Sequence, residues 1–127
     1  MARIRQAFVL GAGMGLRLRP LTEETPKPLV PIFQKPLITF SLDHLCSIGI
    51  ESFVINTHRL AEQFETRFAE GSYAGVPVHL LHEPDLLETG GGIKNAEPWL
   101  RDGVFIVYSG DILTDVPLEP LIDAHFA

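Results

Sequence analysis

The feature that most constrains this chain is a glycine- and proline-rich segment, residues 11–36, directly after a short apolar run. Three of its first five residues are glycine, and five of the ten prolines of the chain fall within it. Proline fixes the backbone angle φ and removes a hydrogen-bond donor, so a long helix cannot follow the glycines at once. Loops of this length are usually functional or disordered, and the apolar residues here favour an ordered one. We therefore expect a stiffened, extended, functional loop.

Strand and helix patterns alternate along the chain. Short apolar runs predict strands at residues 4–10, 50–55, 76–81 and 104–108. Apolar residues at helical spacing predict helices at 36–48, 60–70, 93–100 and from 117 onward. Such alternation is typical of parallel βαβ units. The sequence therefore predicts a single Rossmann-like α/β domain, with an open, mainly parallel sheet and helices on both faces.

The polar and glycine-rich loops all follow predicted strands. They comprise residues 11–31, 56–58, 82–92 and 109–115. The carboxyl ends of parallel strands meet at one edge of a sheet, where open α/β folds bind ligands. We therefore expect these four loops to form one site.

The charge distribution indicates what kind of ligand this site takes. The net charge is −6, yet residues 1–35 hold six basic side chains and only two acidic ones. An acidic protein with a local cationic patch suits a small anion better than a nucleic acid. No apolar run approaches the ~20 residues that a membrane helix needs, so no membrane partner is expected. The single cysteine, Cys46, favours a cytoplasmic protein.

The glycine loop is suited to phosphate. Backbone N–H groups that turn inward at glycines bind anions, and Arg17, Arg19 and Lys27 add positive charge nearby. A dinucleotide fingerprint needs a third glycine three residues after the second and then a helix; here residue 16 is Leu16 and prolines follow. A Walker A loop is also absent. A plain tight turn with solvated arginines is the alternative interpretation.

Two further loops hold candidate ligand groups. Asp111 follows a strand and a glycine, which is a common position for a carboxylate that binds Mg²⁺ beside phosphates; the alternative is a turn or helix cap. Residues 88–92 offer bare backbone at a helix start, either for the edge of a base or as a flexible cap. The roles of Asn56, His58 and Lys94 stay open.

Five stretches together resemble the sugar-1-phosphate nucleotidyltransferases, the enzymes that make nucleotide sugars. The stretches are Leu10-Gly-Ala-Gly-Met-Gly-Leu-Arg-Leu-Arg-Pro-Leu-Thr22, Thr25-Pro-Lys-Pro-Leu-Val-Pro31, Lys35-Pro-Leu-Ile38, Glu88-Thr-Gly-Gly-Gly-Ile93 and Ser109-Gly-Asp-Ile-Leu-Thr-Asp115. The resemblance covers essentially the whole chain. It is strongest to the mannose-1-phosphate guanylyltransferase and N-acetylmuramate-1-phosphate uridylyltransferase branch, which implies a glycosyltransferase-A-like fold.

The resemblance also implies a reaction and residue roles. An NTP and a sugar 1-phosphate would give an NDP-sugar and pyrophosphate, with Mg²⁺ as cofactor. Arg17 would bind the β- and γ-phosphates, Lys27 would bridge the attacking and α-phosphates, and Asp111 would ligate the metal. The other implied nucleotide-binding residues form two groups. The backbone of Leu10, Gly11, Ala12, Gly13, Met14 and Gly15 would bind the phosphates, and the segment around Glu83, Thr89, Gly90 and Gly91 would hold the base.

Two departures from the family pattern accompany the resemblance. Leu16 stands where the family usually has Thr or Ser, so a hydroxyl contact with phosphate is lost. Family members run well past 200 residues, so residues 1–127 are expected to be the nucleotide-binding N-terminal part, with the C-terminal sugar-binding part absent. The fourth strand would then present an open edge that favours self-association. A non-catalytic regulatory module that binds nucleotide is the alternative function, and an NAD-binding domain is a weaker one.

Overall fold

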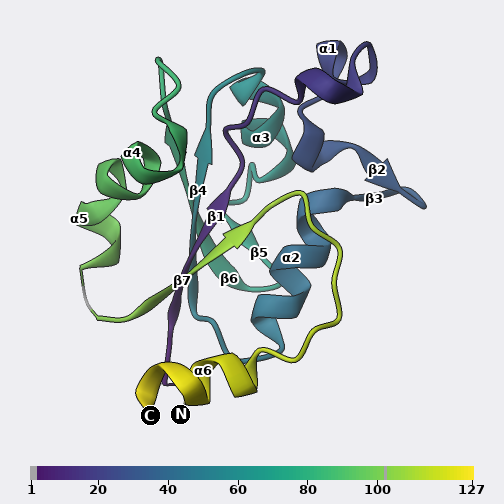
Figure 1. The fold of residues 1–127 in the computed structure, drawn as a ribbon. Helices are drawn as coiled ribbons and strands as arrows, with labels where there is room; N and C mark the ends of the chain where they lie inside the picture. Colours follow the sequence, from purple (N-terminus) through teal and green to yellow (C-terminus); the bar gives the residue numbers. More distant parts are fainter. Residues whose placement is uncertain (1–2, 102) are drawn as a thin grey trace.

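The computed structural model describes residues 3–101 and 103–127. Its centre is a five-stranded sheet in the order β5-β6-β4-β1-β7 (Figure 1). The strands are Gln6–Leu10 (β1), Ser52–Thr57 (β4), Ser72–Tyr73 (β5), Val76–His82 (β6) and Phe105–Ser109 (β7). β1 pairs in parallel with β4 and β7, and β4 in parallel with β6. Only the short β5, which the sequence did not predict, pairs antiparallel. The predicted mainly parallel α/β fold is confirmed.

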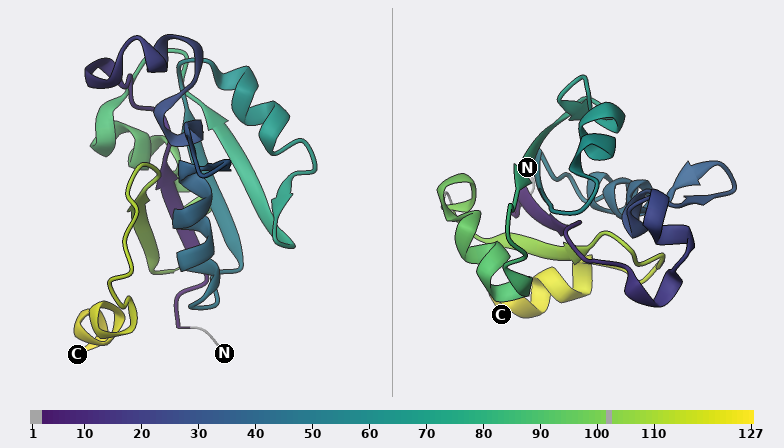
Figure 2. Two further views of the ribbon diagram at one scale, coloured as in Figure 1. Left: turned by 90° about the vertical axis from the view of Figure 1, so that its right-hand side faces the viewer. Right: turned by 90° about the horizontal axis from the view of Figure 1, so that it is seen from above.

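Helices cover both faces of the sheet (Figure 2). Alternate residues of a strand point to opposite faces. Ala7 and Val9 of β1 therefore pack in one core, and Phe8 packs in the other. The first core takes residues from α2 (Leu37–Cys46), α3 (Ala61–Arg67) and α6 (Glu119–Phe126); the second lies beneath α4 (Glu88–Asn95) and α5 (Glu97–Leu100). α6 lies at the opposite end of the sheet from α1 (Leu21–Glu24) (Figure 1).

The expectation of an extended loop at residues 11–36 is wrong. The segment folds into three short helical turns and a hairpin. These are η1 (Leu16–Leu18), α1, η2 (Lys27–Leu29) and the paired strands β2 (Pro31–Ile32) and β3 (Lys35–Pro36). Proline fits the first turn of a helix, where its missing N–H would have no partner anyway. Pro26 and Pro28 accordingly flank Lys27 at the start of η2, where the Leu29 N–H donates to the Pro26 carbonyl at 2.9 Å.

Two element boundaries differ from the prediction in ways that affect the site. α4 begins at Glu88, so the glycines at 90–92 lie within the helix rather than before it. β4 extends to Thr57, so Asn56 lies inside a central strand and is only 2% exposed. Tertiary pairing with β6 extends the strand through polar residues that no apolar pattern marks.

β7 is the edge strand of the described sheet, and apolar side chains around it are exposed, including Val104 and Val107. In the part of the chain that the structure describes, no helix is both long and apolar enough to cross a membrane.

Candidate functional site

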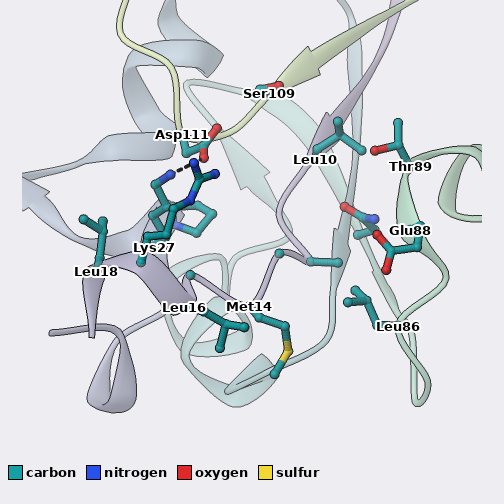
Figure 3. Close-up of a pocket in the computed structure, with 16 residues that line it drawn as sticks. Leu10, Met14, Leu16, Leu18, Lys27, Leu86, Glu88, Thr89, Ser109 and Asp111 are labelled. Carbon is teal, nitrogen blue, oxygen red and sulfur yellow. Dashed lines mark ion pairs between the residues drawn. The ribbon is translucent and has the colours of Figure 1, made fainter. Parts of the chain in front are cut away.

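The loops that follow β1, β6 and β7, together with the carboxyl end of β4, line a cavity of about 480 Å³ at the carboxyl edge of the sheet (Figure 3). The expected convergence at this edge is therefore confirmed, although the β4 contribution comes from Asn56 within the strand. The cavity is lined by Leu10, residues 12–18, Lys27, Pro28, Asn56, Leu86, Glu88, Thr89, Ser109 and Asp111.

One end of the cavity holds charged groups, and we call it the Lys27 end. Lys27 Nζ lies 2.8 Å from Asp111 Oδ2, and each side chain is about one-third exposed. Figure 3 shows this ion pair at the side of the cavity formed by the loops after β1 and β7. The exposed Arg17 lines the same cavity. The three residues predicted to do the chemistry are thus brought to one cavity.

Close contact between two strands places Asp111. The Gly110 N–H donates to the Leu10 carbonyl at 3.0 Å. A Cβ at Gly110 would lie 2.7 Å from that same oxygen, so no larger residue fits there. The Ser41 hydroxyl of α2 donates to the Ser109 carbonyl at 3.1 Å. The same hydroxyl lies 3.3 Å from the Ile112 carbonyl, so the backbone is held on both sides of Asp111.

Side chains from distant segments stabilise the glycine loop. Gly15 adopts φ +65°, a conformation that favours glycine, and its carbonyl accepts a 2.5 Å hydrogen bond from the Thr22 hydroxyl. Arg59 donates in turn to the carbonyls of Thr22 and Glu23. Sequence reasoning missed Arg59 because it lies after β4 and has no local motif. It stabilises the loop and is not among the residues that line the cavity.

The opposite end of the cavity lies at the start of α4, and we call it the Thr89 end. Leu86, Glu88 and Thr89 line it, and Figure 3 shows the side chains of Glu88 and Thr89 pointing toward the cavity. Glu88 has φ +60°, which is unfavourable for a residue with a side chain. An acidic group here would repel phosphate, so the two ends of the cavity differ in the ligand groups that they can accept.

Four predicted nucleotide-binding residues do not line the cavity: Gly11, Glu83, Gly90 and Gly91. The Gly11 N–H donates to Asn56 Oδ1 at 2.7 Å, so it does not face a ligand. Glu83 is fully buried, and its Oε2 accepts a 2.9 Å hydrogen bond from Asn56 Nδ2. Glu83 therefore lies behind the wall of the cavity rather than on its surface.

Several residues that line the cavity had no assigned role. Asn56 and Ser109 lie at the carboxyl ends of β4 and β7. Their positions at strand ends were the available signal, and Asn56 was left open because a turn explained it equally well. Leu16, for which a lost hydroxyl contact was expected, lines the cavity with its side chain 53% exposed. Leu18, Pro28 and Leu86 add further apolar surface.

Within residues 3–101 and 103–127, no three His, Cys, Asp or Glu side chains lie together as a metal site. Asp111 is the carboxylate that lines the cavity beside Lys27. Mg²⁺ usually keeps several waters and binds one or two carboxylates together with substrate phosphates. The donor set fits a metal that arrives with phosphate.

Comparison with protein families shows which family this chain belongs to. Residues 6–127 match the family model described as nucleotidyl transferase. The chain belongs to the nucleotidyl transferase family.

Relatives of the chain within this family are named for different substrates. The chain is 39% identical to a mannose-1-phosphate guanylyltransferase of Mycobacterium tuberculosis, over 94% of this chain and 33% of the relative. It is 45% identical to an N-acetylmuramate alpha-1-phosphate uridylyltransferase of Neisseria meningitidis, over 87% of this chain and 48% of the relative. The chain thus spans between a third and a half of the length of these two relatives.

The fold is similar to that of solved nucleotidyltransferase structures. HddC from Yersinia pseudotuberculosis superimposes with a TM-score of 0.84 at 26% identity, over 95% of this chain and 54% of that chain. The same protein has been solved in complex with GMP-PN.

Proposed function

We propose that this chain forms the nucleotide-binding part of a sugar-1-phosphate nucleotidyltransferase. In the proposed reaction, a phosphate oxygen of the sugar 1-phosphate attacks the α-phosphorus of an NTP. The bond from that phosphorus to the β-phosphate oxygen breaks, and pyrophosphate leaves with the electron pair. The single observation that most supports this proposal is the cavity that brings Arg17, Lys27 and Asp111 together above the glycine loop.

The asymmetry of the cavity supports one orientation of the nucleotide. The Lys27 end offers two cationic side chains and the backbone of Gly13, whose surroundings are open. The Thr89 end offers a carboxylate and a hydroxyl, which accept hydrogen bonds from the donors of a base or ribose. We therefore place the triphosphate at the Lys27 end and the base at the Thr89 end.

Arg17 and Lys27 have different roles in this proposal. Arg17 binds the β- and γ-phosphates, where its planar guanidinium suits two oxygens at once. Lys27 leaves Asp111 and lies between the attacking and α-phosphates, where it acts as a point charge. Because the reaction needs no covalent enzyme intermediate, catalysis consists of positioning and electrostatic stabilisation.

Asp111 is the residue that would hold Mg²⁺. Its carboxylate lines the cavity beside Lys27, and phosphate oxygens and water would complete the metal's coordination. The metal would supply positive charge at the phosphates. Mg²⁺ dependence, a cytoplasmic location and association through the β7 edge all stay predictions.

Calorimetry tests the proposal. GTP and UTP are titrated with and without Mg²⁺ into the wild type, Arg17→Ala and Arg19→Ala. Arg19 is the matched control because it is exposed on the same segment but does not line the cavity. We expect Mg²⁺-dependent binding of at least one NTP, about tenfold weaker or more in Arg17→Ala because a charged hydrogen bond is lost, and unchanged in Arg19→Ala.

Absence of binding by both nucleotides, or equal affinity in the wild type and Arg17→Ala, would contradict the proposal. Turnover with mannose 1-phosphate or N-acetylmuramate 1-phosphate is then measured by pyrophosphate release. Turnover would eliminate the alternative of a non-catalytic regulatory module, whereas weak binding with little or no turnover is what we expect of the nucleotide-binding part by itself.

A further inference from the structure

Glu83 is a fully buried acidic residue to which the proposed chemistry gives no direct task. Its two side-chain oxygens are both occupied within the protein. Oε2 accepts from Asn56 Nδ2 at 2.9 Å, and Oε1 accepts from the Leu87 N–H at 3.3 Å. Asn56 Oδ1 accepts in turn from the Gly11 N–H at 2.7 Å. One chain of hydrogen bonds therefore runs from the glycine loop to the start of α4.

Asn56 and Glu83 are also held by α4 and by the pairing of β4 with β6. A Cβ at Gly92 would lie 3.0 Å from both Asn56 Nδ2 and Glu83 Oε2, so the helix backbone packs directly against the pair. The Glu83 N–H donates to the Thr57 carbonyl at 2.7 Å, which continues the pairing of β4 with β6. Because hydrogen bonds hold the pair to the glycine loop, to β4 and to the residue before α4, the pair can fix the separation of the two segments that it joins.

The two joined segments are the two ends of the cavity. Gly11 opens the loop that lines the Lys27 end, and Leu87 immediately precedes Glu88 and Thr89 at the other end. A ligand that contacts only one end needs no fixed separation, whereas a nucleotide that spans both ends does. A binding site gains affinity when it is already held in the bound geometry.

We propose that the Asn56–Glu83 pair is a positioning element that couples the phosphate end of the nucleotide site to the base end. The inference rests on the proposed function, because it assumes that a nucleotide spans the cavity. Glu83 acts here through Asn56 and the Leu87 N–H, and it touches no substrate. This role differs from the place beside the base that the family resemblance implies for Glu83.

The direction of the hydrogen bonds allows a sharp test. At position 56 the side chain accepts from Gly11 and donates to Glu83, and at position 83 it accepts twice. Asn56→Asp alone sets two acceptors against each other, and Glu83→Gln alone sets two donors against each other. The double variant Asn56→Asp/Glu83→Gln exchanges the amide and the carboxylate. Every hydrogen bond of the chain can then form again, with the same total charge.

The experiment compares nucleotide with inorganic triphosphate. Calorimetry measures the affinities of Mg²⁺-GTP, Mg²⁺-UTP and Mg²⁺-triphosphate for the wild type, both single variants and the double variant. Thermal unfolding is followed in parallel. Ile122→Ala serves as the control, because Ile122 is buried in α6 at the far end of the sheet and its truncation lowers stability without touching the pair (Figure 1).

We expect Glu83→Gln to bind the preferred NTP about tenfold more weakly, the effect of one buried hydrogen bond, while its affinity for triphosphate changes little. Asn56→Asp adds a carboxylate at a residue that lines the cavity, so it should weaken the binding of both ligands. The double variant should bind the NTP more tightly than either single variant, and Ile122→Ala should keep wild-type affinity despite lower stability. If a single variant fails to fold, Gly92→Ala takes its place, because it presses on the pair without removing a hydrogen bond.

The inference is overturned if the NTP and triphosphate affinities of Glu83→Gln fall together, if neither changes, or if the double variant binds the NTP no more tightly than the single variants. A wild type that binds neither GTP nor UTP instead overturns the proposed function. A wild type that binds an NTP, together with a Glu83→Gln variant whose affinities match those of Ile122→Ala, overturns the coupling alone.

Discussion

The two ends of the cavity are built in different ways. At the Lys27 end the charged groups come from short motifs, and backbone contacts such as Gly110 N–H to the Leu10 carbonyl fix them in place. At the Thr89 end the exposed start of α4 is placed by a buried pair, Asn56 and Glu83, that lies outside the motif. Local sequence therefore specifies the Lys27 end, whereas tertiary contacts specify the Thr89 end. Four predictions test this difference, from the largest expected effect to the smallest.

The largest effect should come from a charge at the Lys27 end. Lys27→Met removes a cation that faces the triphosphate, so triphosphate and NTP affinity should both fall about ten- to a hundredfold. Thr89→Val, at the other end, should weaken NTP binding and leave triphosphate binding intact. Calorimetry with Mg²⁺-triphosphate separates the two ends, and equal losses in both variants would show that the ends are not distinct.

The second-largest effect should come from removing space for a backbone contact at the Lys27 end, and it should appear in the free energy of unfolding. Gly110→Ala places a Cβ 2.7 Å from the Leu10 carbonyl oxygen, whereas a Cβ at Gly13 meets nothing within 4 Å. We expect Gly110→Ala to lower the free energy of unfolding by about 1–3 kcal/mol, as overpacking does, and Gly13→Ala to change it by less than about 0.5 kcal/mol. Urea denaturation measures both. Similar values for the two variants would mean that the strand-to-loop contact does not fix Asp111.

The Thr89 end offers a matched pair of glycines within α4. Gly90→Ala has open space and should stabilise the helix by about 0.5–1 kcal/mol. Gly92→Ala places its Cβ 3.0 Å from Asn56 Nδ2 and Glu83 Oε2, so this crowding should cancel the gain in helix stability. We expect its free energy of unfolding to be about 1 kcal/mol lower than that of Gly90→Ala. Thermal unfolding provides the comparison. Equal stabilisation by both substitutions would indicate that the pair yields easily and sets no fixed distance.

The smallest effect should come from an ion pair outside the cavity. Lys35 Nζ lies 2.7 Å from Asp43 Oδ2, and Tyr73 also donates to this carboxylate. Burial raises the pKa of Asp43, but the hydrogen bonds from Lys35 and Tyr73 outweigh it and lower the pKa overall. The pair therefore stabilises the fold above the ordinary aspartate pKa, and its contribution disappears as pH falls through the lowered one.

Because both side chains are more than one-third exposed, we expect Asp43→Asn to cost less than about 1 kcal/mol at pH 7 and nothing in strong acid. Urea denaturation across pH 2–7 checks this. Lys35→Met should leave nucleotide affinity unchanged, in contrast to Lys27→Met, although both lysines form short ion pairs. A loss of nucleotide affinity in Lys35→Met would show that the charge effect is not confined to the cavity.

The sequence predicted the fold and much of the cavity because apolar periodicity and strand-end loops are local signals. Arg17, Lys27, Asp111 and Thr89 all line the cavity as a consequence. The internal structure of residues 11–36 was missed, because proline was interpreted as a barrier to helix although it fits the first turn of short ones.

Gly11 and Glu83, which do not line the cavity, share a physical reason. Gly11 and Glu83 were expected to contact the nucleotide, yet each uses its polar groups to bond Asn56. Whether a buried polar group faces a ligand or a neighbouring strand depends on register, which no single segment encodes. Arg59 stabilises the glycine loop for the same kind of reason, since its partners lie more than 35 residues earlier in the chain.

A crystal structure with Mg²⁺ and the more tightly bound of GTP and UTP would test the central claim most directly. The account predicts the triphosphate beside Gly13, Arg17 and Lys27, the metal on Asp111, and the base beside Thr89. A nucleotide bound in the reverse direction, with its base against Lys27, or bound outside the cavity, would contradict the account.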